Sequence, residues 1–185
     1  MKLHVKDFIT LPNILSYIRL LLIPVFMTQY LTAAENKDYY LAGLIVVFSG
    51  LTDLLDGLIA RKFNQITDLG KLLDPVADKL TQIAVIICLI FRYEKMWIIV
   101  SLFIVKELFM AVNNIVLYRQ GKRLDGAKWF GKISTAVFYA CMTFLVAFPS
   151  IQPTTAAILM IITGFFLALS FVLYGCEFFK MYQHD

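Results

Sequence analysis

Charge is scarce in this chain: only 16% of its 185 residues are Asp, Glu, Lys or Arg, whereas 60% are hydrophobic. The mean hydropathy of +0.76 lies far above that of a water-soluble domain, so the composition predicts a membrane protein. Segments rich in Gly, Ser or Pro are missing, as are repeats and low-complexity stretches. We therefore expect one compact domain over residues 1–185.

Cysteine and histidine patterns are missing as well. Cys88, Cys141 and Cys176 are far apart in apolar runs and lack the spacing of a metal site, so we interpret them as small buried hydrophobic residues. The N-terminal stretch lacks the charged region, the apolar region and the small-residue cleavage site of a signal peptide. A cleaved leader is therefore not expected.

Long apolar runs, in contrast, are abundant. A membrane-spanning helix needs about 20 mostly apolar residues. Six stretches meet this requirement: 12–33, 39–61, 71–92, 96–118, 127–148 and 154–180. Residues 1–10 are predicted to form a short interfacial segment. The predicted fold class is an all-α integral membrane protein with six transmembrane helices and an N-terminal interfacial segment.

The distribution of Lys and Arg predicts the orientation of these spans, because cytoplasmic loops carry an excess of both residues. With a cytoplasmic N-terminus, twelve Lys and Arg residues fall on the cytoplasmic side and three on the opposite side. We therefore expect a cell-membrane protein with both termini in the cytoplasm. The Asp-rich ends of the second and third spans then also face the cytoplasm.

These two spans carry small and charged residues on one face each. On the second span, spacings of three and four residues align Asp53, Asp56, Gly57, Ala60 and Arg61. On the third span, a spacing of four aligns Gly70, Asp74 and Asp78. The two spans are predicted to be antiparallel neighbours joined by a short turn. We therefore expect the four carboxylates to converge at the cytoplasmic boundary of the membrane.

A converging group of carboxylates needs compensation. One Asp at the centre of a spanning helix costs about 2.5–3.5 kcal/mol, and neighbouring like charges repel each other. Carboxylate oxygens are the ligands that Mg²⁺, Mn²⁺ or Ca²⁺ prefer. Two such ions are a usual device in phosphoryl transfer. The small residues Gly57, Ala60 and Gly70 allow either close helix packing or room for a flat ligand such as a nucleotide.

The same residues resemble the signature of a known family. The pattern reads Asp53-x-x-Asp56-Gly57-x-x-Ala60-Arg61, eight residues, then Gly70-x-x-x-Asp74-x-x-x-Asp78. It is similar to the complete motif of the CDP-alcohol phosphotransferases. Within that family the opening segment, LPNILSYIRLLLIP, and the segment LLDPVADKL resemble those of the phosphatidylglycerophosphate synthases.

The resemblance implies a reaction and a role for each motif residue. A phosphatidyl group would pass from CDP-diacylglycerol to sn-glycerol 3-phosphate, with release of CMP. Asp53, Asp56, Asp74 and Asp78 would hold Mg²⁺ or Mn²⁺, as two ions, and Asp78 would also act as the catalytic base. The donor site would comprise Asp53, Gly57, Ala60, Arg61, Gly70 and Asp74, with Arg61 on the diphosphate. Related proteins are homodimers, and a homodimer is expected here.

The phosphate of the acceptor needs cations that face the cytoplasm. The candidates are Arg19, Arg119, Lys122, Arg123 and Lys132. Lys132 stands in WFGKIST, which resembles the family's Gly-Lys-x-x-Thr element. The family opening carries an Arg at the place of Arg19, which would bind a phosphate of the donor or the acceptor, or extend to lipid headgroups. For the loop residues, the alternative is that they are positive-inside anchors at lipid headgroups.

Other functions remain open at this point. A cardiolipin synthase would use the same chemistry with phosphatidylglycerol as acceptor and would need fewer cations. A cation transporter would hold the Asp residues as its ion site, although these would then be spread along a path through the bilayer. A non-catalytic membrane scaffold would use the polar face as a subunit interface. No nucleic-acid partner is expected.

Overall fold

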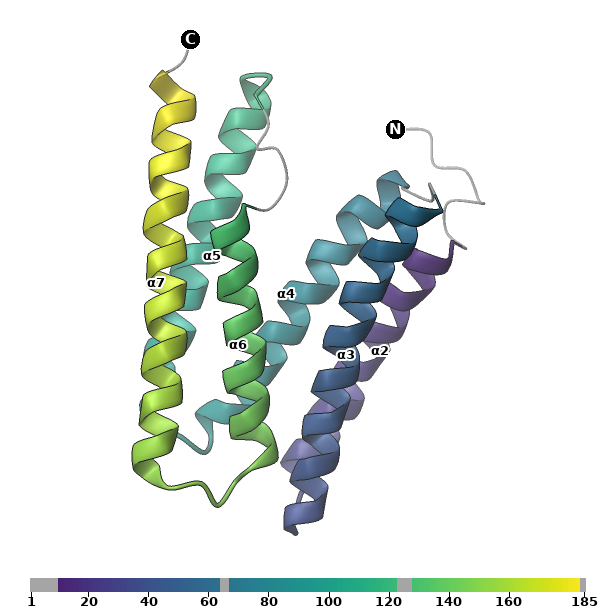
Figure 1. The fold of residues 1–185 in the computed structure, drawn as a ribbon, viewed down its shortest axis with the longest axis vertical. Coiled ribbons are helices and arrows are strands. Elements are labelled where there is room, and N and C mark those ends of the chain that lie inside the picture. The colour runs from purple at the N-terminus through teal and green to yellow at the C-terminus, as the bar shows by residue number, and fades with distance from the viewer. Residues whose placement is uncertain (1–9, 64–66, 123–127, 184–185) are drawn as a thin grey trace. The chain divides into compact units, whose positions relative to one another are not determined.

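The computed structural model describes residues 10–63, 67–122 and 128–183 (Figure 1). Six helices occur there: α2 (Leu11–Leu31), α3 (Asn36–Lys62), α4 (Asp68–Ile90), α5 (Met96–Arg119), α6 (Trp129–Ala147) and α7 (Pro153–Gln183). Each helix coincides with one predicted stretch, within three residues at either end. The interfacial segment predicted for residues 1–10 lies outside the described residues, apart from Thr10.

Five of these described helices, α2, α3, α5, α6 and α7, are long and apolar enough to cross a membrane. The 23-residue helix α4 does not qualify, because Asp74, Asp78 and Lys79 interrupt its apolar run. The prediction of an all-α integral membrane protein is therefore confirmed, and the protein is multi-pass. The count of six spans differs by one, and the difference is the helix that carries half of the Asp motif.

Local side-chain contacts explain where α3 and α4 begin. The Asp38 carboxylate accepts hydrogen bonds from the backbone N–H groups of Ala34 and Glu35, at 3.1 and 3.0 Å. The Thr67 hydroxyl accepts one from the Gly70 N–H at 2.9 Å. The Asp38 bonds belong to a capping box at the start of α3, and the Thr67 bond satisfies an N–H that the first turn of α4 leaves without an intrahelical partner. Both helices consequently start three residues earlier than hydropathy predicts.

The chain divides into two compact units, of which the first comprises residues 1–92 and 143–150. In this unit α2 packs along both α3 and α4, whereas α3 and α4 contact each other only slightly (Figure 1). Its core lies between the three helices, where Phe26, Val46 and Ala84 are buried. At the end of α4, the Arg92 guanidinium donates to the Pro149 carbonyl at 2.9 Å.

The second unit comprises residues 93–142 and 151–185. Leu117 of α5, Phe130 of α6, and Tyr174 and Phe178 of α7 form its buried cluster. Gly131 is required for this packing, because a β-carbon there would overlap the Tyr174 hydroxyl. This part of the WFGKIST segment therefore has a role in folding.

The cysteine prediction holds for two residues and is wrong for the third. Cys88 and Cys141 are buried, whereas Cys176 on α7 is exposed. All sides of a membrane helix can be apolar, including the side that faces lipid. An apolar sequence around a cysteine therefore does not distinguish a core position from a lipid-facing one.

Candidate active site

Three of the predicted carboxylates meet in the first unit. Asp53 and Asp56 lie one turn apart on α3, and Asp74 lies on the second turn of α4. Each offers a carboxylate oxygen, and these oxygens all lie within 4.8 Å of one another. A group of hard oxygen donors at this separation fits a divalent cation such as Mg²⁺, Mn²⁺ or Ca²⁺.

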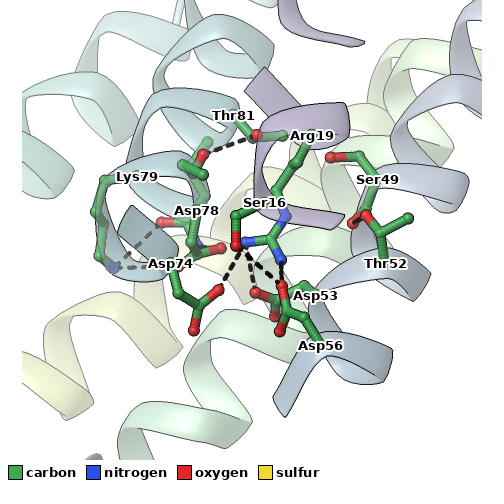
Figure 2. A network of polar contacts seen from close by, with 12 residues as sticks. Ser16, Arg19, Ser49, Thr52, Asp53, Asp56, Asp74, Asp78, Lys79 and Thr81 are labelled. Atoms are coloured by element: carbon green, nitrogen blue, oxygen red, sulfur yellow. Dashed lines mark hydrogen bonds and ion pairs between the residues drawn. The ribbon is translucent and has the colours of Figure 1, made fainter. Parts of the chain in front are cut away.

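The helix that joins these carboxylates is α2, through Arg19. Figure 2 shows the Arg19 side chain reaching from α2 into the space between them. Its Nη1 lies 2.7 Å from Asp53 Oδ1 and 3.1 Å from Asp74 Oδ1, and its Nη2 forms an ion pair with Asp56 Oδ2. The Arg19 side chain is wholly buried. One guanidinium thus binds all three carboxylates.

The three carboxylates differ in their access to solvent. The Asp56 side chain is 4% exposed, that of Asp53 is 30% exposed and that of Asp74 is 43% exposed. The Ser16 hydroxyl, one turn before Arg19, also reaches Asp56 Oδ2 at 3.5 Å (Figure 2). Asp56 is therefore the buried anchor of the group, and Asp53 and Asp74 form its accessible side.

The fourth predicted carboxylate, Asp78, is not a member of this three-residue group. It lies one turn beyond Asp74 on α4 (Figure 2). The Gln82 side-chain amide donates to both of its oxygens at 3.3 Å, and Lys79 Nζ lies 3.8 Å away. Asp78 therefore borders the cluster with polar partners from its own helix.

Asn13 also contributes to the site, although the sequence analysis assigns it no role. Its Nδ2 donates to Thr67 Oγ1 at 3.1 Å, and the same Thr67 oxygen caps α4 at Gly70. A β-carbon at Gly70 would lie 2.6 Å from Asn13 Oδ1. The first turn of α4 is thereby fixed against α2 at Gly70, four residues before Asp74. The sequence signal for this cap is Thr67 itself, because threonine is a favoured N-cap residue.

The residues predicted to bind the donor nucleotide are only partly described. Gly57 and Ala60 are half-buried on α3, on the face that also carries Asp53 and Asp56. The Arg61 side chain lies outside the described part of the chain. Glycine at position 70 is also explained by packing, because Asn13 occupies the space that a β-carbon would need.

The residues predicted to bind the acceptor phosphate are divided between the two units. Arg19 belongs to the first unit, where it binds the carboxylates. Arg119, Lys122 and Lys132 belong to the second unit, where Arg119 and Lys132 are exposed. Lys122 Nζ donates to the Met181 carbonyl at 2.9 Å and so links the end of α5 to the end of α7. Arg123 lies outside the described residues.

Comparisons with known proteins show what the chain is similar to. A family model described as CDP-alcohol phosphatidyltransferase matches residues 9–172. A Mycobacterium tuberculosis (strain ATCC 25618 / H37Rv) protein named "Putative cardiolipin synthase" is 36% identical over 143 residues, which are 77% of this chain and 64% of that protein. The "CDP-diacylglycerol--glycerol-3-phosphate 3-phosphatidyltransferase" of Escherichia coli (strain K12) is 29% identical over 162 residues, 86% of this chain and 88% of that protein. The chain thus spans less than two thirds of the mycobacterial relative.

Proposed function

Because the chain belongs to the CDP-alcohol phosphatidyltransferase family, we propose that it transfers a phosphatidyl group from CDP-diacylglycerol to sn-glycerol 3-phosphate. The products are phosphatidylglycerophosphate and CMP. The observation that carries this proposal is the meeting of Asp53, Asp56 and Asp74 within the matched region. The name and near full-length match of the Escherichia coli relative support glycerol 3-phosphate as the acceptor.

The family uses a divalent metal, and the carboxylates of Asp53, Asp56 and Asp74 provide suitable ligands. The proposed metals are Mg²⁺ or Mn²⁺, as two ions, with Asp78 completing the ligand set. When bound, they would stabilise the negative charge that develops on the diphosphate. The exposure of Asp53 and Asp74 supports this assignment, because substrate must reach the same place.

Asp78 is the proposed base. The acceptor hydroxyl oxygen attacks the phosphorus that bears the diacylglycerol, and its proton passes to an Asp78 oxygen. The bond from that phosphorus to the bridging oxygen breaks, and the oxygen leaves with CMP. The place of Asp78 beside the cluster, one turn from Asp74, supports this role (Figure 2).

Recognition of the substrates is assigned to small and basic residues. Gly57, Ala60 and Gly70 would leave room for the cytidine, and Arg61 would bind the diphosphate. Arg119, Lys122, Arg123 and Lys132 would bind the phosphate of the acceptor. The exposure of Arg119 and Lys132 supports this assignment.

The proposed membrane arrangement includes α4 as a sixth span, with its charged half at the cytoplasmic boundary. Both termini and the active site would face the cytoplasm, as the excess of Lys and Arg indicates. The family match runs through both compact units, which supports one family domain over residues 1–185. The proposed assembly is a homodimer.

One alternative acceptor has a specific observation in its favour. The mycobacterial relative, whose name is that of a cardiolipin synthase, has the higher identity of the two. Phosphatidylglycerol is therefore the second candidate acceptor.

A product assay separates the two acceptors. The purified protein receives CDP-diacylglycerol, Mg²⁺ and one alcohol at a time: glycerol 3-phosphate, phosphatidylglycerol, serine or inositol phosphate. We expect CMP and phosphatidylglycerophosphate only with glycerol 3-phosphate. Cardiolipin as the main product would replace the proposal with its alternative. Absence of CMP with every alcohol, or cation flux into liposomes without nucleotide, would contradict the proposed phosphatidyltransferase activity.

A further inference from the structure

Arg19 binds the same three carboxylates that would hold a metal ion. Two of the carboxylates offer Oδ1 to its Nη1, and the third offers Oδ2 to its Nη2. A carboxylate oxygen that accepts charge-assisted hydrogen bonds has less electron density to give to a cation. Arg19 and a divalent ion are therefore competitors for Asp53, Asp56 and Asp74.

The charge of the site also indicates that Arg19 opposes the binding of a divalent cation. With all three carboxylates ionised, three negative charges and the one positive charge of the guanidinium give the group a formal net charge of −2. Without the guanidinium the net charge would be −3. The burial of Arg19 strengthens this effect, because charges away from water are poorly screened.

The contacts of Arg19 also leave it incompletely satisfied. Its Nε–H is buried and has no hydrogen-bond acceptor among the described residues. A guanidinium with a permanent structural role is ordinarily bound through all of its donors, because an unpaired buried donor carries the full desolvation cost. The Arg19 Nε–H is therefore available to donate to a partner other than these carboxylates.

We propose that Arg19 is an internal counter-ion of the carboxylate cluster that opposes the binding of divalent cations, so that metal binding requires the guanidinium to withdraw. This inference rests on the proposed metal site and adds a residue that sets its affinity. The positive charge of Arg19 balances the negative charge of the buried Asp56 while no metal is bound. A withdrawn guanidinium is then available for a phosphate, the role that the sequence predicts.

The opposite effect would follow if Arg19 were simply a support for the ligands. Partners that orient metal ligands commonly raise metal affinity, and their removal costs roughly 10- to 100-fold in binding. The two roles therefore differ in the sign of the change in metal affinity when Arg19 is replaced.

The test measures Mn²⁺ binding and thermal unfolding of the full chain, purified in detergent and stripped with EDTA. The variants are Arg19→Met, which removes the charge at similar length, and Arg19→Lys, which keeps it. Arg92→Met is the matched control, because Arg92 is an arginine of the same unit that binds Pro149 instead. Free Mn²⁺ is counted from its electron paramagnetic resonance signal, so that the readout does not depend on activity.

We expect Arg19→Met to bind Mn²⁺ at least about tenfold more tightly than the parent. We expect Arg19→Lys to bind it more tightly by a smaller factor, because one ammonium group cannot cover three carboxylates. Without metal, Arg19→Met should unfold at a lower temperature, and saturating Mn²⁺ should raise its melting temperature more than it raises that of the parent. Arg92→Met should leave the Mn²⁺ affinity unchanged.

Equal or weaker Mn²⁺ binding by Arg19→Met would overturn the inference while the metal site itself stood. If Arg19→Met does not fold, Arg19→Lys decides, and unchanged or weaker binding by that variant would overturn the inference equally. Absence of Mn²⁺ binding in the parent and in both variants would instead refute the proposed metal site.

Discussion

The side-chain oxygen of Asn13 on α2 lies where Gly70 on α4 leaves room for it. A β-carbon at Gly70 would be 2.6 Å from Asn13 Oδ1 and 3.0 Å from Thr67 Oγ1. Both neighbours are polar atoms held by hydrogen bonds of their own. The glycine of the sequence motif is therefore also a packing residue, and its two possible roles can be separated.

The first prediction concerns Gly70→Ala. The added methyl group should destabilise the protein by about 1–3 kcal/mol, because Asn13 and Thr67 must shift to accommodate it. The double variant Gly70→Ala with Asn13→Ala should be less destabilised than the sum of the two single changes, since the overlap is gone. Unfolding of the four proteins in detergent micelles gives the cycle, with Gly50→Ala as the control, because nothing lies within 4 Å of that position.

Additive effects in this cycle would contradict the steric explanation. The cycle also tests the proposed donor site. If the double variant regains stability but keeps a raised KM for CDP-diacylglycerol, Gly70 contributes to nucleotide binding as well. If stability and KM recover together, its role is packing alone.

The helices of this protein could be predicted from the sequence, because hydrophobicity over about 20 residues is a strong signal. The largest differences, of three residues, occur at the starts of α3 and α4, where Asp38 and Thr67 cap the helices, and at the end of α7. Hydropathy does not register a polar cap. The cap residues are themselves visible in the sequence, so this part of the error was avoidable.

The site could be predicted only in part. Periodicity identified which residues share a face of α3 and a face of α4, and the structure brings Asp53, Asp56 and Asp74 together. Periodicity does not indicate that a third helix, α2, packs against the Asp-bearing faces of α3 and α4. The family resemblance predicts that Arg19 binds a phosphate. Its contact with the carboxylates could not be predicted, because this contact depends on the position of α2, which is a tertiary property.

The second prediction is that Asp74→Asn lowers kcat/KM by at least about a hundredfold, since an amide is a poorer metal ligand and carries no charge. Asp74 is the best of the three for this test, because its 43% exposure makes misfolding less of a concern than at Asp56. Melting temperatures of variant and parent, measured together with CMP release, separate catalysis from folding. Glu94→Gln, an exposed acid changed in the same way, should retain activity. Parental activity in Asp74→Asn would contradict the assigned role.

The third prediction concerns removal of the metal. Protein treated with EDTA and then freed of the chelator should release no CMP, and activity should return on addition of Mg²⁺ or Mn²⁺. Mass spectrometric counting of the metal in reactivated protein should approach two ions per chain. A count of one would correct the proposed number, whereas full activity in the stripped protein would contradict the metal-dependent mechanism.

The fourth prediction separates two lysines of the second unit. Lys132 is exposed near the start of α6, so Lys132→Ala should leave the melting temperature unchanged. Its KM for glycerol 3-phosphate should rise about tenfold, the effect of losing one charge-assisted hydrogen bond to a phosphate. The KM for CDP-diacylglycerol should remain that of the parent, because the donor is assigned to other residues.

Lys122→Ala should behave differently, because Lys122 holds the end of α5 to the Met181 carbonyl of α7. We expect a lower melting temperature in this variant. Any rise in its KM for glycerol 3-phosphate should therefore be accompanied by a loss of stability. Lys95→Ala is the matched control for both lysines, since the Lys and Arg distribution assigns Lys95 to the opposite side of the membrane. An unchanged KM for glycerol 3-phosphate in both Lys132→Ala and Lys122→Ala would remove these lysines from the acceptor site. Because phosphatidylglycerol makes less demand on cations, that result would also favour it as the acceptor.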